Sequence, residues 1–219
     1  RVSGIFYGGK YANFLASLLL CLAAIYWMPF GQKILFMIMT FPMTIQEMIS
    51  MSPDGFTISL CLFFIAYVFH LSYGNVEKLR KRDFCILAGL SLMIALCKIV
   101  YVVLILLTFI IPNQKIGERK TWMGLKFGIF SMALAANLIW LQISSVYLVE
   151  IRPGVNAAEQ IRYILLNIGD FYGIAVRTLM ENSDYFIKTM FGDPMGALNI
   201  ALSPFVWITF LFLFLYEIY

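Results

Sequence analysis

Six long apolar runs dominate this chain of 219 residues, and each is close to the length that a membrane-spanning helix requires. A helix crosses the hydrocarbon core of a bilayer with about 20 mostly apolar residues. Hydrophobic residues make up 62% of the chain and charged residues 13%, about half the charged fraction of a soluble domain. We therefore expect a multi-pass membrane protein, which excludes a disordered chain, a nucleic-acid module and a disulfide-stapled secreted domain. The runs cover residues 12–30, 34–49, 55–73, 84–111, 125–149 and 201–219.

The run 34–49 does not fit a simple spanning helix. It is short and contains Pro42, Gln46 and Glu47, which predicts a kinked helix that is partly buried in protein. The run 12–30, by contrast, has tyrosine and tryptophan near its ends, the aromatic-belt pattern of a spanning helix.

Lysine and arginine gather in two short loops, which sets the expected orientation. The loops 74–83 and 112–126 each contain four such residues. Short basic loops stay on the cytoplasmic side, so both loops are assigned to the cytoplasm. The segment 150–200 carries four cations against six carboxylates and is assigned to the extracytoplasmic side. Arg1 and Lys10 then lie on the side that the charge rule disfavours.

Two basic loops on the same side require an even number of crossings between them. The run 84–111 is therefore predicted to be a hairpin of two short helices that turns near Cys97 and Lys98. Each arm would be about 20 Å long at 1.5 Å per residue, shorter than the roughly 30 Å hydrocarbon core. The alternative is one tilted span of about 42 Å, which violates the charge rule. Neither glycine nor proline marks the turn.

The segment 150–200 is predicted to form short amphipathic helices on the outer face. Asn156 and Glu159 have the capping-box spacing, which predicts a helix over 157–168. Asp170 is expected to cap a second helix. Apolar side chains at near-helical spacing should place both helices on the membrane surface or on the bundle. This apolar stripe consists of Ile161, Leu165, Ile168, Phe171, Ile174 and Leu179.

These elements together predict an all-α fold, a polytopic transmembrane helix bundle of about six or seven spans in the cell membrane. Residues 1–149 would form the transmembrane bundle. Residues 150–200 would form the extracytoplasmic amphipathic helical segment, and residues 201–219 a final, truncated transmembrane helix.

Ionisable side chains at membrane depth are expensive and usually face a cavity or a partner. This test selects Glu47, Asp54 and Lys98, all toward the outer end. Asp54 is either part of a Pro-Asp-Gly turn that caps the next helix, or a carboxylate that binds a metal, a sugar hydroxyl or an acceptor. Lys98 is either a lysine that extends to the headgroups, or a fixed cation for a lipid-linked phosphate that Tyr101 could share. Gln46, two turns before Asp54, could face the same cavity.

The single histidine and the four cysteines do not indicate a metal site. His70 is interpreted as an interfacial residue near the cytoplasmic end of its helix. The cysteines lie far apart in apolar stretches without a C-x-x-C pair, which leaves too few ligands for zinc or an iron–sulfur cluster and predicts buried packing thiols. The basic residues 78–82 are interpreted as an orientation signal and a contact to lipid headgroups.

Several short motifs in this chain belong to one pattern. Residues 1–11 lead into a span, and a second span ends in Pro42-Met-Thr and Ser50-Met-Ser-Pro-Asp54. The hairpin then carries Ala95-Leu-Cys-Lys98-Ile-Val-Tyr101, followed by Ile111-Pro112, and the outer segment contributes Gln160, Thr178, Gly192 and Gly196. The pattern resembles a family of predicted multi-pass bacterial membrane proteins of unknown function that is placed near the GT-C glycosyltransferases.

The resemblance implies a GT-C-like fold and a membrane-embedded glycosyltransferase. Such an enzyme takes a sugar from a polyprenyl-phosphate donor and passes it to a glycan or lipid acceptor of the cell envelope at the outer face. Membrane lipids, donor and acceptor are the implied partners, and nucleic acid is not. The chain departs from the pattern at Ile99, where relatives often have glycine or proline.

The resemblance also implies roles for individual residues. Asp54 is the candidate catalytic residue. The main catalytic carboxylate of such enzymes typically follows the first span. The chain starts without a methionine and ends within an apolar run, so we expect it to be the middle of a longer polypeptide that carries this carboxylate. A divalent cation, Mg²⁺ or Mn²⁺, is the one cofactor that the chemistry could use. The candidate substrate-binding residues are Lys98, Tyr101, Gln46, Arg152 and Arg1.

Two other classes of function stay open. A transporter or flippase for a lipid-linked glycan would use the same cations, but it should show discontinuous helices in repeated halves. A non-catalytic membrane subunit would need no donor site.

Overall fold

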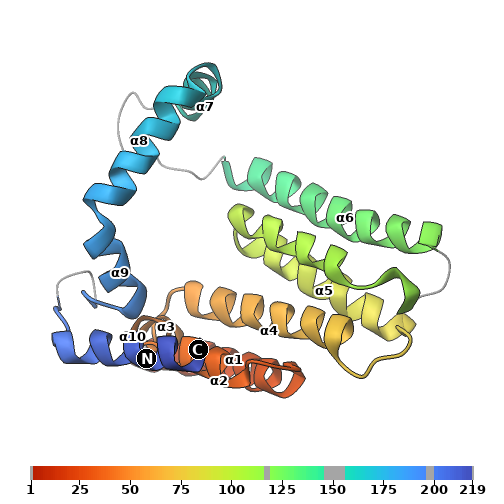
Figure 1. The fold of residues 1–219 in the computed structure, drawn as a ribbon, viewed down its shortest axis with the longest axis horizontal. Coiled ribbons are helices and arrows are strands. Elements are labelled where there is room, and N and C mark those ends of the chain that lie inside the picture. Colours follow the sequence, from red (N-terminus) through yellow and green to blue (C-terminus); the bar gives the residue numbers. More distant parts are fainter. Residues whose placement is uncertain (1, 116–118, 146–155, 196–199, 219) are drawn as a thin grey trace.

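The computed structural model describes residues 2–115, 119–145, 156–195 and 200–218, and these residues are almost entirely helical (Figure 1). This confirms the all-α prediction for the described part of the chain. In chain order the elements are α1 (Val2–Trp27), α2 (Gln32–Met39), α3 (Pro42–Ile49), α4 (Asp54–Tyr73), α5 (Lys81–Cys97), η1 (Ile99–Ile110), η2 (Asn113–Lys115), α6 (Arg119–Ser145), α7 (Ala157–Leu166), α8 (Ile168–Glu181), α9 (Ser183–Phe191) and α10 (Pro204–Ile218).

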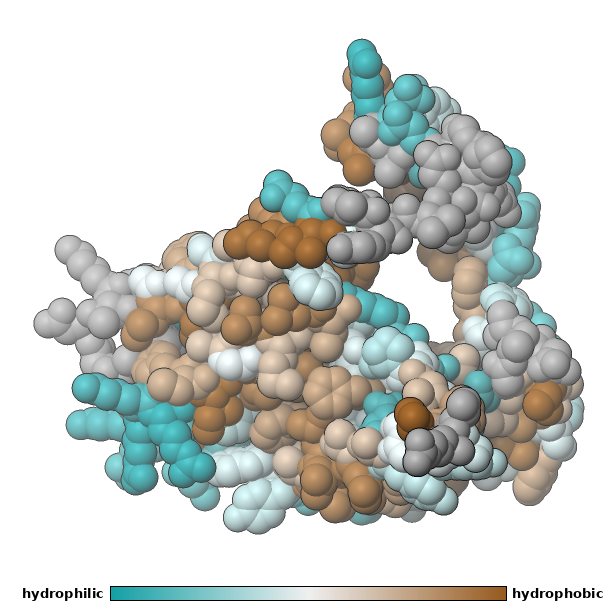
Figure 2. Space-filling model, turned by 180° about the vertical axis from the view of Figure 1, so that it is seen from behind, coloured by the Kyte–Doolittle hydropathy of each residue, from teal (hydrophilic) through white to brown (hydrophobic). Residues whose placement is uncertain are grey.

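Three helices among the described residues are long and apolar enough to cross a membrane. They are Ser3–Trp27 in α1, Asp54–Tyr73 in α4 and Met123–Ser144 in α6, and two shorter apolar helices, η1 and α10, accompany them. Apolar side chains cover much of the surface of the bundle, while polar side chains gather mainly at one end and on α7 and α8 (Figure 2). The number of six or seven spans stays a prediction.

Small side chains bring α1 and α4 together. Ser17, Cys21 and Ala24 lie on one face of α1 and are buried, as are Ser59 and Ala66 of α4. The Cys21 thiol donates a hydrogen bond to the Ser59 hydroxyl, with 3.5 Å between sulfur and oxygen. Small residues let two helix backbones approach closely where lipid replaces water around them, and α1 therefore packs closely along α4.

The first helix begins earlier than the apolar pattern predicts. The span was expected from residue 12, whereas α1 begins at Val2. No proline interrupts residues 2–11, and the Lys10 ammonium lies 4.7 Å from the centre of the Phe6 ring one turn earlier, which supports the helix beyond its apolar run.

The predicted kink in the run 34–49 is confirmed, and it is a complete break between α2 and α3. Pro42 occupies the first turn of α3, where its missing N–H costs nothing, and Phe41 before it has an extended backbone. The Phe41 side chain is buried in the gap. It contacts the rings of Phe191, Phe210 and Phe214, so that α9 and α10 dock at the break.

The hairpin predicted for the run 84–111 is confirmed, and the single tilted span is wrong. The helix is interrupted at Lys98, whose backbone is extended with φ −150° and ψ 136°. The following helix, η1, packs back against α5 and also against α4 and α6. At the far end, the Leu79 N–H donates to the Lys115 carbonyl at 2.8 Å, so the two basic loops lie at the same end of the bundle. Their assignment to the cytoplasm stays a prediction.

The second arm of the hairpin is a 3₁₀ helix of 12 residues. Its buried residues, Val102, Ile105 and Thr108, recur every third position, which is the period of that helix. The segment is rich in β-branched residues, which disfavour the α-helix. Because a 3₁₀ helix rises about 2 Å per residue, η1 reaches about 24 Å and matches the roughly 25 Å of α5.

Two lysines in the basic loops bind helix-end carbonyl groups. The Lys115 ammonium donates to the carbonyls of Leu71 (2.9 Å), Ser72 (3.0 Å) and Gly74 (3.4 Å) at the end of α4. The last carbonyls of a helix lack partners within that helix and carry partial negative charge. Lys115 therefore ties the end of α4 to the end of the hairpin.

Lys126 does the same for η1 from within α6. Its side chain is buried, with 2% exposed, and its ammonium donates to the carbonyls of Phe109 (3.0 Å) and Ile111 (2.7 Å). It also lies 3.4 Å from the Asn113 side-chain oxygen. The sequence assigned Lys126 only to a basic loop, whereas the structure makes it an internal donor.

Residues 156–195 form three short helices where two were predicted. The Asn156 side chain accepts the Glu159 N–H at 3.5 Å, as the capping-box spacing predicts. The first helix ends at Leu166, however, and α8 begins at Ile168, so Asp170 lies within the first turn and not at the cap. Figure 1 shows α7 and α8 reaching away from the bundle. All six side chains of their apolar stripe are exposed, so the described part of the bundle does not pack against them. Contact of the stripe with the membrane surface stays a prediction.

Replacing Lys126 by methionine should lower the stability of the folded protein. The change keeps the length of the side chain and removes the donor of one buried and one part-buried carbonyl, and a buried carbonyl left unsatisfied costs about 1–3 kcal/mol. The unfolding midpoint in detergent checks this, with Lys81→Met as the matched control because Lys81 is exposed. Equal midpoints for the two variants would contradict the role of Lys126.

Candidate functional site

Asp54 and Lys98 form an ion pair at the end of the bundle opposite the basic loops. The Lys98 ammonium lies 2.5 Å from an Asp54 carboxylate oxygen. Asp54 is the first residue of α4, and Lys98 separates the two arms of the hairpin. Their side chains are 38% and 47% exposed, so a ligand can reach both. The structure thus brings together two residues that the sequence selected separately.

The Asp54 carboxylate does not cap its own helix. Serine hydroxyls accept the backbone N–H groups in this loop: the N–H of Asp54 donates to the Ser52 hydroxyl at 3.1 Å, and the N–H of Ser52 donates to the Ser50 hydroxyl at 2.9 Å. No side-chain capping hydrogen bond is present at the start of α4. The interpretation of Asp54 as a helix cap is therefore wrong, and its carboxylate is directed to Lys98.

Asn13 of α1 holds the loop that precedes Asp54. Its side-chain amide donates to the carbonyls of Ser50 (3.0 Å) and Ser52 (3.1 Å), and a longer contact of 3.4 Å reaches the carbonyl of Met48. These carbonyls follow the end of α3, where no further helical turn can satisfy them. Sequence reasoning missed Asn13, and its only signal was an amide side chain near the start of an apolar run.

Gly55 allows α4 to begin directly against α3. A Cβ atom on Gly55 would lie 2.5 Å from the Glu47 carbonyl oxygen and 2.6 Å from the Met48 Cα. These contacts are too short for any side chain, and both involve backbone that cannot move aside. Glycine at this position therefore fixes how closely Asp54 approaches α3.

On the other side of the pair, Asn137 of α6 holds the last turn of α5. Its side-chain amide donates to the Ala95 carbonyl at 2.5 Å, and both residues are buried. This carbonyl lies three residues before Lys98, in the turn where α5 ends. Asn137 is thus a second positioning residue that the sequence did not reveal.

Glu47 and Tyr101 lie near Lys98. Both lie close enough to Lys98 to act on its charge. The cluster therefore contains two carboxylates, one ammonium and one phenol. Gly55, which follows Asp54, lies directly against the backbone of Glu47, so the two acidic residues belong to neighbouring backbone segments.

The use of Mg²⁺ or Mn²⁺ stays a prediction. The Lys98 ammonium forms an ion pair with the Asp54 carboxylate. Within the described ranges, no group of three or more histidine, cysteine, aspartate or glutamate residues lies close enough to hold a metal ion.

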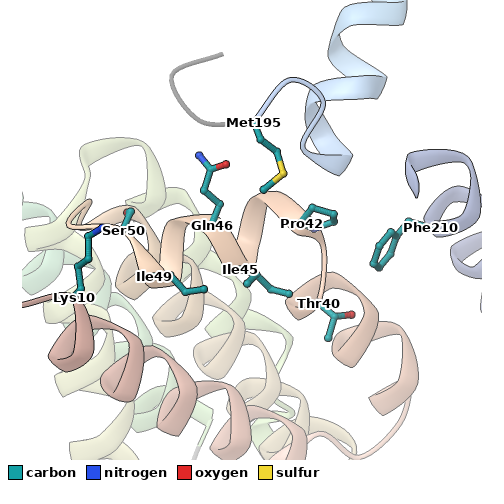
Figure 3. Close-up of a pocket in the computed structure, with 9 residues that line it drawn as sticks. All are labelled: Lys10, Thr40, Pro42, Ile45, Gln46, Ile49, Ser50, Met195 and Phe210. Carbon is teal, nitrogen blue, oxygen red and sulfur yellow. The ribbon is translucent and has the colours of Figure 1, made fainter. Parts of the chain in front are cut away.

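Gln46 lines a different hollow. This hollow has a volume of about 550 Å³ and lies between α1, α3 and the C-terminal region (Figure 3). Figure 3 shows Gln46 reaching from α3 toward Met195, with Lys10 and Ser50 farther along the wall. Neither Asp54 nor Lys98 contributes to this wall. The other two sequence candidates, Arg1 and Arg152, lie outside the described residues.

The cysteines and the histidine take ordinary places. Cys21 and Cys61 are buried as expected, but Cys85 is exposed and Cys97 is half-buried, which corrects the prediction of four buried thiols. His70 lies in the last turn of α4 with its ring against Trp27, at a centroid distance of 4.5 Å.

The family model described as predicted membrane protein (DUF2142) matches residues 1–218. The chain belongs to this family. Neither the comparison with curated proteins nor that with solved structures gave a significant match. The family description agrees with the long apolar helices of the bundle.

Replacing Gly55 by alanine should destabilise the start of α4. The added methyl group collides with the Glu47 carbonyl, and overpacking of this kind costs about 1–3 kcal/mol. The matched control is Gly89→Ala in α5, where a Cβ meets nothing within 4 Å and the better helix propensity of alanine should be neutral or stabilising. A Gly55→Ala variant that unfolds in detergent at the same temperature as Gly89→Ala would refute the close contact.

Proposed function

We propose that this chain is the membrane-embedded part of a glycosyltransferase that uses a polyprenyl-phosphate-linked sugar. The acceptor is a glycan or a lipid of the cell envelope, and transfer takes place at the outer face. The proposal depends on one observation, the Asp54–Lys98 ion pair at the junction of α4 with the hairpin.

The pair supports this chemistry because it places a carboxylate and a cation, the two groups that the reaction needs, in direct contact. Sugar transfer from a lipid phosphate needs a carboxylate that accepts the proton of the acceptor hydroxyl. It also needs a cation that stabilises the departing phosphate. A half-exposed ion pair contributes only about 0–1 kcal/mol, so a phosphate oxygen can replace Asp54 on Lys98 at little cost.

The reaction then follows from this exchange. The donor phosphate binds Lys98 and releases the Asp54 carboxylate. The acceptor oxygen forms a bond to the anomeric carbon of the sugar, while the bond from that carbon to the phosphate oxygen breaks. The proton of the acceptor goes to Asp54, and polyprenyl phosphate leaves as an anion held by Lys98.

The remaining candidates have supporting roles in this proposal. Tyr101, beside Lys98, would donate a hydrogen bond to the same phosphate. Gln46 would contact the acceptor in the hollow of about 550 Å³ that it lines. Arg1 and Arg152 remain candidate phosphate ligands outside the described residues.

Asp54→Asn and Lys98→Gln should each reduce sugar transfer by about 100-fold or more in membranes that contain the full-length protein, because each removes a group that acts on the transition state. Transfer is measured from a radiolabelled polyprenyl-phosphate sugar. The matched control is the exposed ion pair of α9, Asp184 with Lys188 at 2.6 Å, replaced by Asn and Gln.

The exchanged pair, Asp54→Lys with Lys98→Asp, separates chemistry from structure. It keeps an ion pair at the same place, so the protein should unfold near the wild-type temperature, but transfer should stay lost. Wild-type transfer in both single variants, or recovery in the exchanged pair, would reject the proposed roles.

The orientation of the chain can be tested with introduced cysteines. Met51 and Asn75 are exposed at opposite ends of α4, and Cys85→Ser removes the exposed native thiol. A membrane-impermeant maleimide added to intact cells should label Met51→Cys and not Asn75→Cys, because the basic loop is expected in the cytoplasm. Labelling of Asn75→Cys alone would place the Asp54–Lys98 pair at the cytoplasmic face.

A further inference from the structure

A polar cavity, distinct from the hollow that Gln46 lines, lies at the end of the bundle that carries the basic loops. It has a volume of about 590 Å³ and is enclosed by the ends of α1 and α4, the loop 75–80 and the first turns of α5. It is separated from the Asp54–Lys98 pair by the whole length of α4, which is about 30 Å for 20 residues. No role in sugar transfer has been assigned to it.

The wall of this cavity is built by internal hydrogen bonds. The Tyr67 hydroxyl donates to one oxygen of the Asp83 carboxylate at 2.9 Å, and the Arg80 N–H donates to the other at 2.7 Å. Tyr67 is buried, with 2% of its surface exposed. The loop is also tied to the hairpin, because the Leu79 N–H donates to the Lys115 carbonyl. The cavity is therefore a formed feature and not a chance gap between mobile side chains.

The cavity has an excess of cationic side chains. Lys78, Arg80 and Arg82 line it, and none of these three forms an ion pair in the described part of the chain. Glu77 and Asp83 also line the cavity, so three cationic side chains face two carboxylates and the surplus charge is positive. The start of α5 adds the partial positive charge of a helix N-terminus.

Aromatic rings place this cavity at the level of lipid headgroups. Trp27 lies on the wall and packs edge-on against the rings of Tyr67 (5.6 Å) and His70 (4.5 Å). Tryptophan and tyrosine prefer the interface between lipid and water, where a cavity is accessible to headgroups and to solutes.

We propose that this cavity binds a phosphate-bearing anion through the guanidinium groups of Arg80 and Arg82. Arginine presents two parallel N–H donors to a phosphate, and Lys78 adds a point charge. The same chemistry describes the headgroup of an anionic phospholipid and free inorganic phosphate. This site is independent of the sugar-transfer site, and so is its test.

The test compares the unfolding midpoint of the full-length protein in a neutral detergent with three additives. These are short-chain phosphatidylglycerol, short-chain phosphatidylcholine and inorganic phosphate. Saturating phosphatidylglycerol should raise the midpoint by about 5 °C, because a ligand that binds only the folded state stabilises it. Phosphatidylcholine, which has no net charge, should not. A similar rise with inorganic phosphate would identify the phosphate group itself as the ligand.

The double variant Arg80→Gln with Arg82→Gln should abolish this rise. The Arg80 bond to Asp83 comes from the backbone N–H, so the wall should remain in place. The control is Lys81→Gln with Lys33→Gln, which removes the same charge from exposed positions off the wall. Arg80→Lys with Arg82→Lys keeps the charge and should retain a smaller rise. The inference is overturned if wild type gains nothing from either phosphate, or if the control loses as much as the glutamine variant.

Discussion

Carbonyl groups at helix ends need hydrogen-bond donors, and in a lipid environment water cannot supply them. Side chains from distant parts of the chain meet this requirement at four places among the described residues. Lys115 binds the end of α4, Lys126 the end of η1, Asn13 the loop after α3, and Asn137 the last turn of α5. Each donor comes from a different part of the chain than its carbonyl. The same bonds that satisfy the backbone therefore also connect the helices of the bundle.

Two of these donors set the geometry of the Asp54–Lys98 pair. Asn13 fixes the backbone before Asp54, and Asn137 fixes the backbone before Lys98. The pair itself is half-exposed and contributes little to stability, since exposed ion pairs contribute about 0–1 kcal/mol. Its position is thus determined by the backbone around it and not by the attraction of the two charges. Such an arrangement leaves both charged groups free to exchange partners while they stay within reach of each other.

The sequence predicted those features that depend on local composition and on charge. The break at Pro42 followed from proline, and the hairpin at Lys98 followed from two basic loops that had to share one side. Asp54 and Lys98 were visible because charges are rare in apolar runs. Asn13 and Asn137 were not, because their partners lie 37 and 42 residues away. The 3₁₀ helix could not be read from spacing, because every residue of 99–110 is apolar or carries a hydroxyl and the buried third positions do not stand out.

The two polar ends of the bundle differ in the sign of their surplus charge. At the hairpin tip, Glu47 and Asp54 outnumber Lys98, so an anion can bind there only by displacing a carboxylate. At the basic end, three cations face the two carboxylates of Glu77 and Asp83, so the surplus charge is positive and an anion can enter directly. Displacement weakens ground-state binding, which favours a substrate that must leave again after reaction. Direct entry favours a ligand that stays bound, so the proposed sugar-transfer site would suit turnover and the proposed phosphate site would suit occupancy.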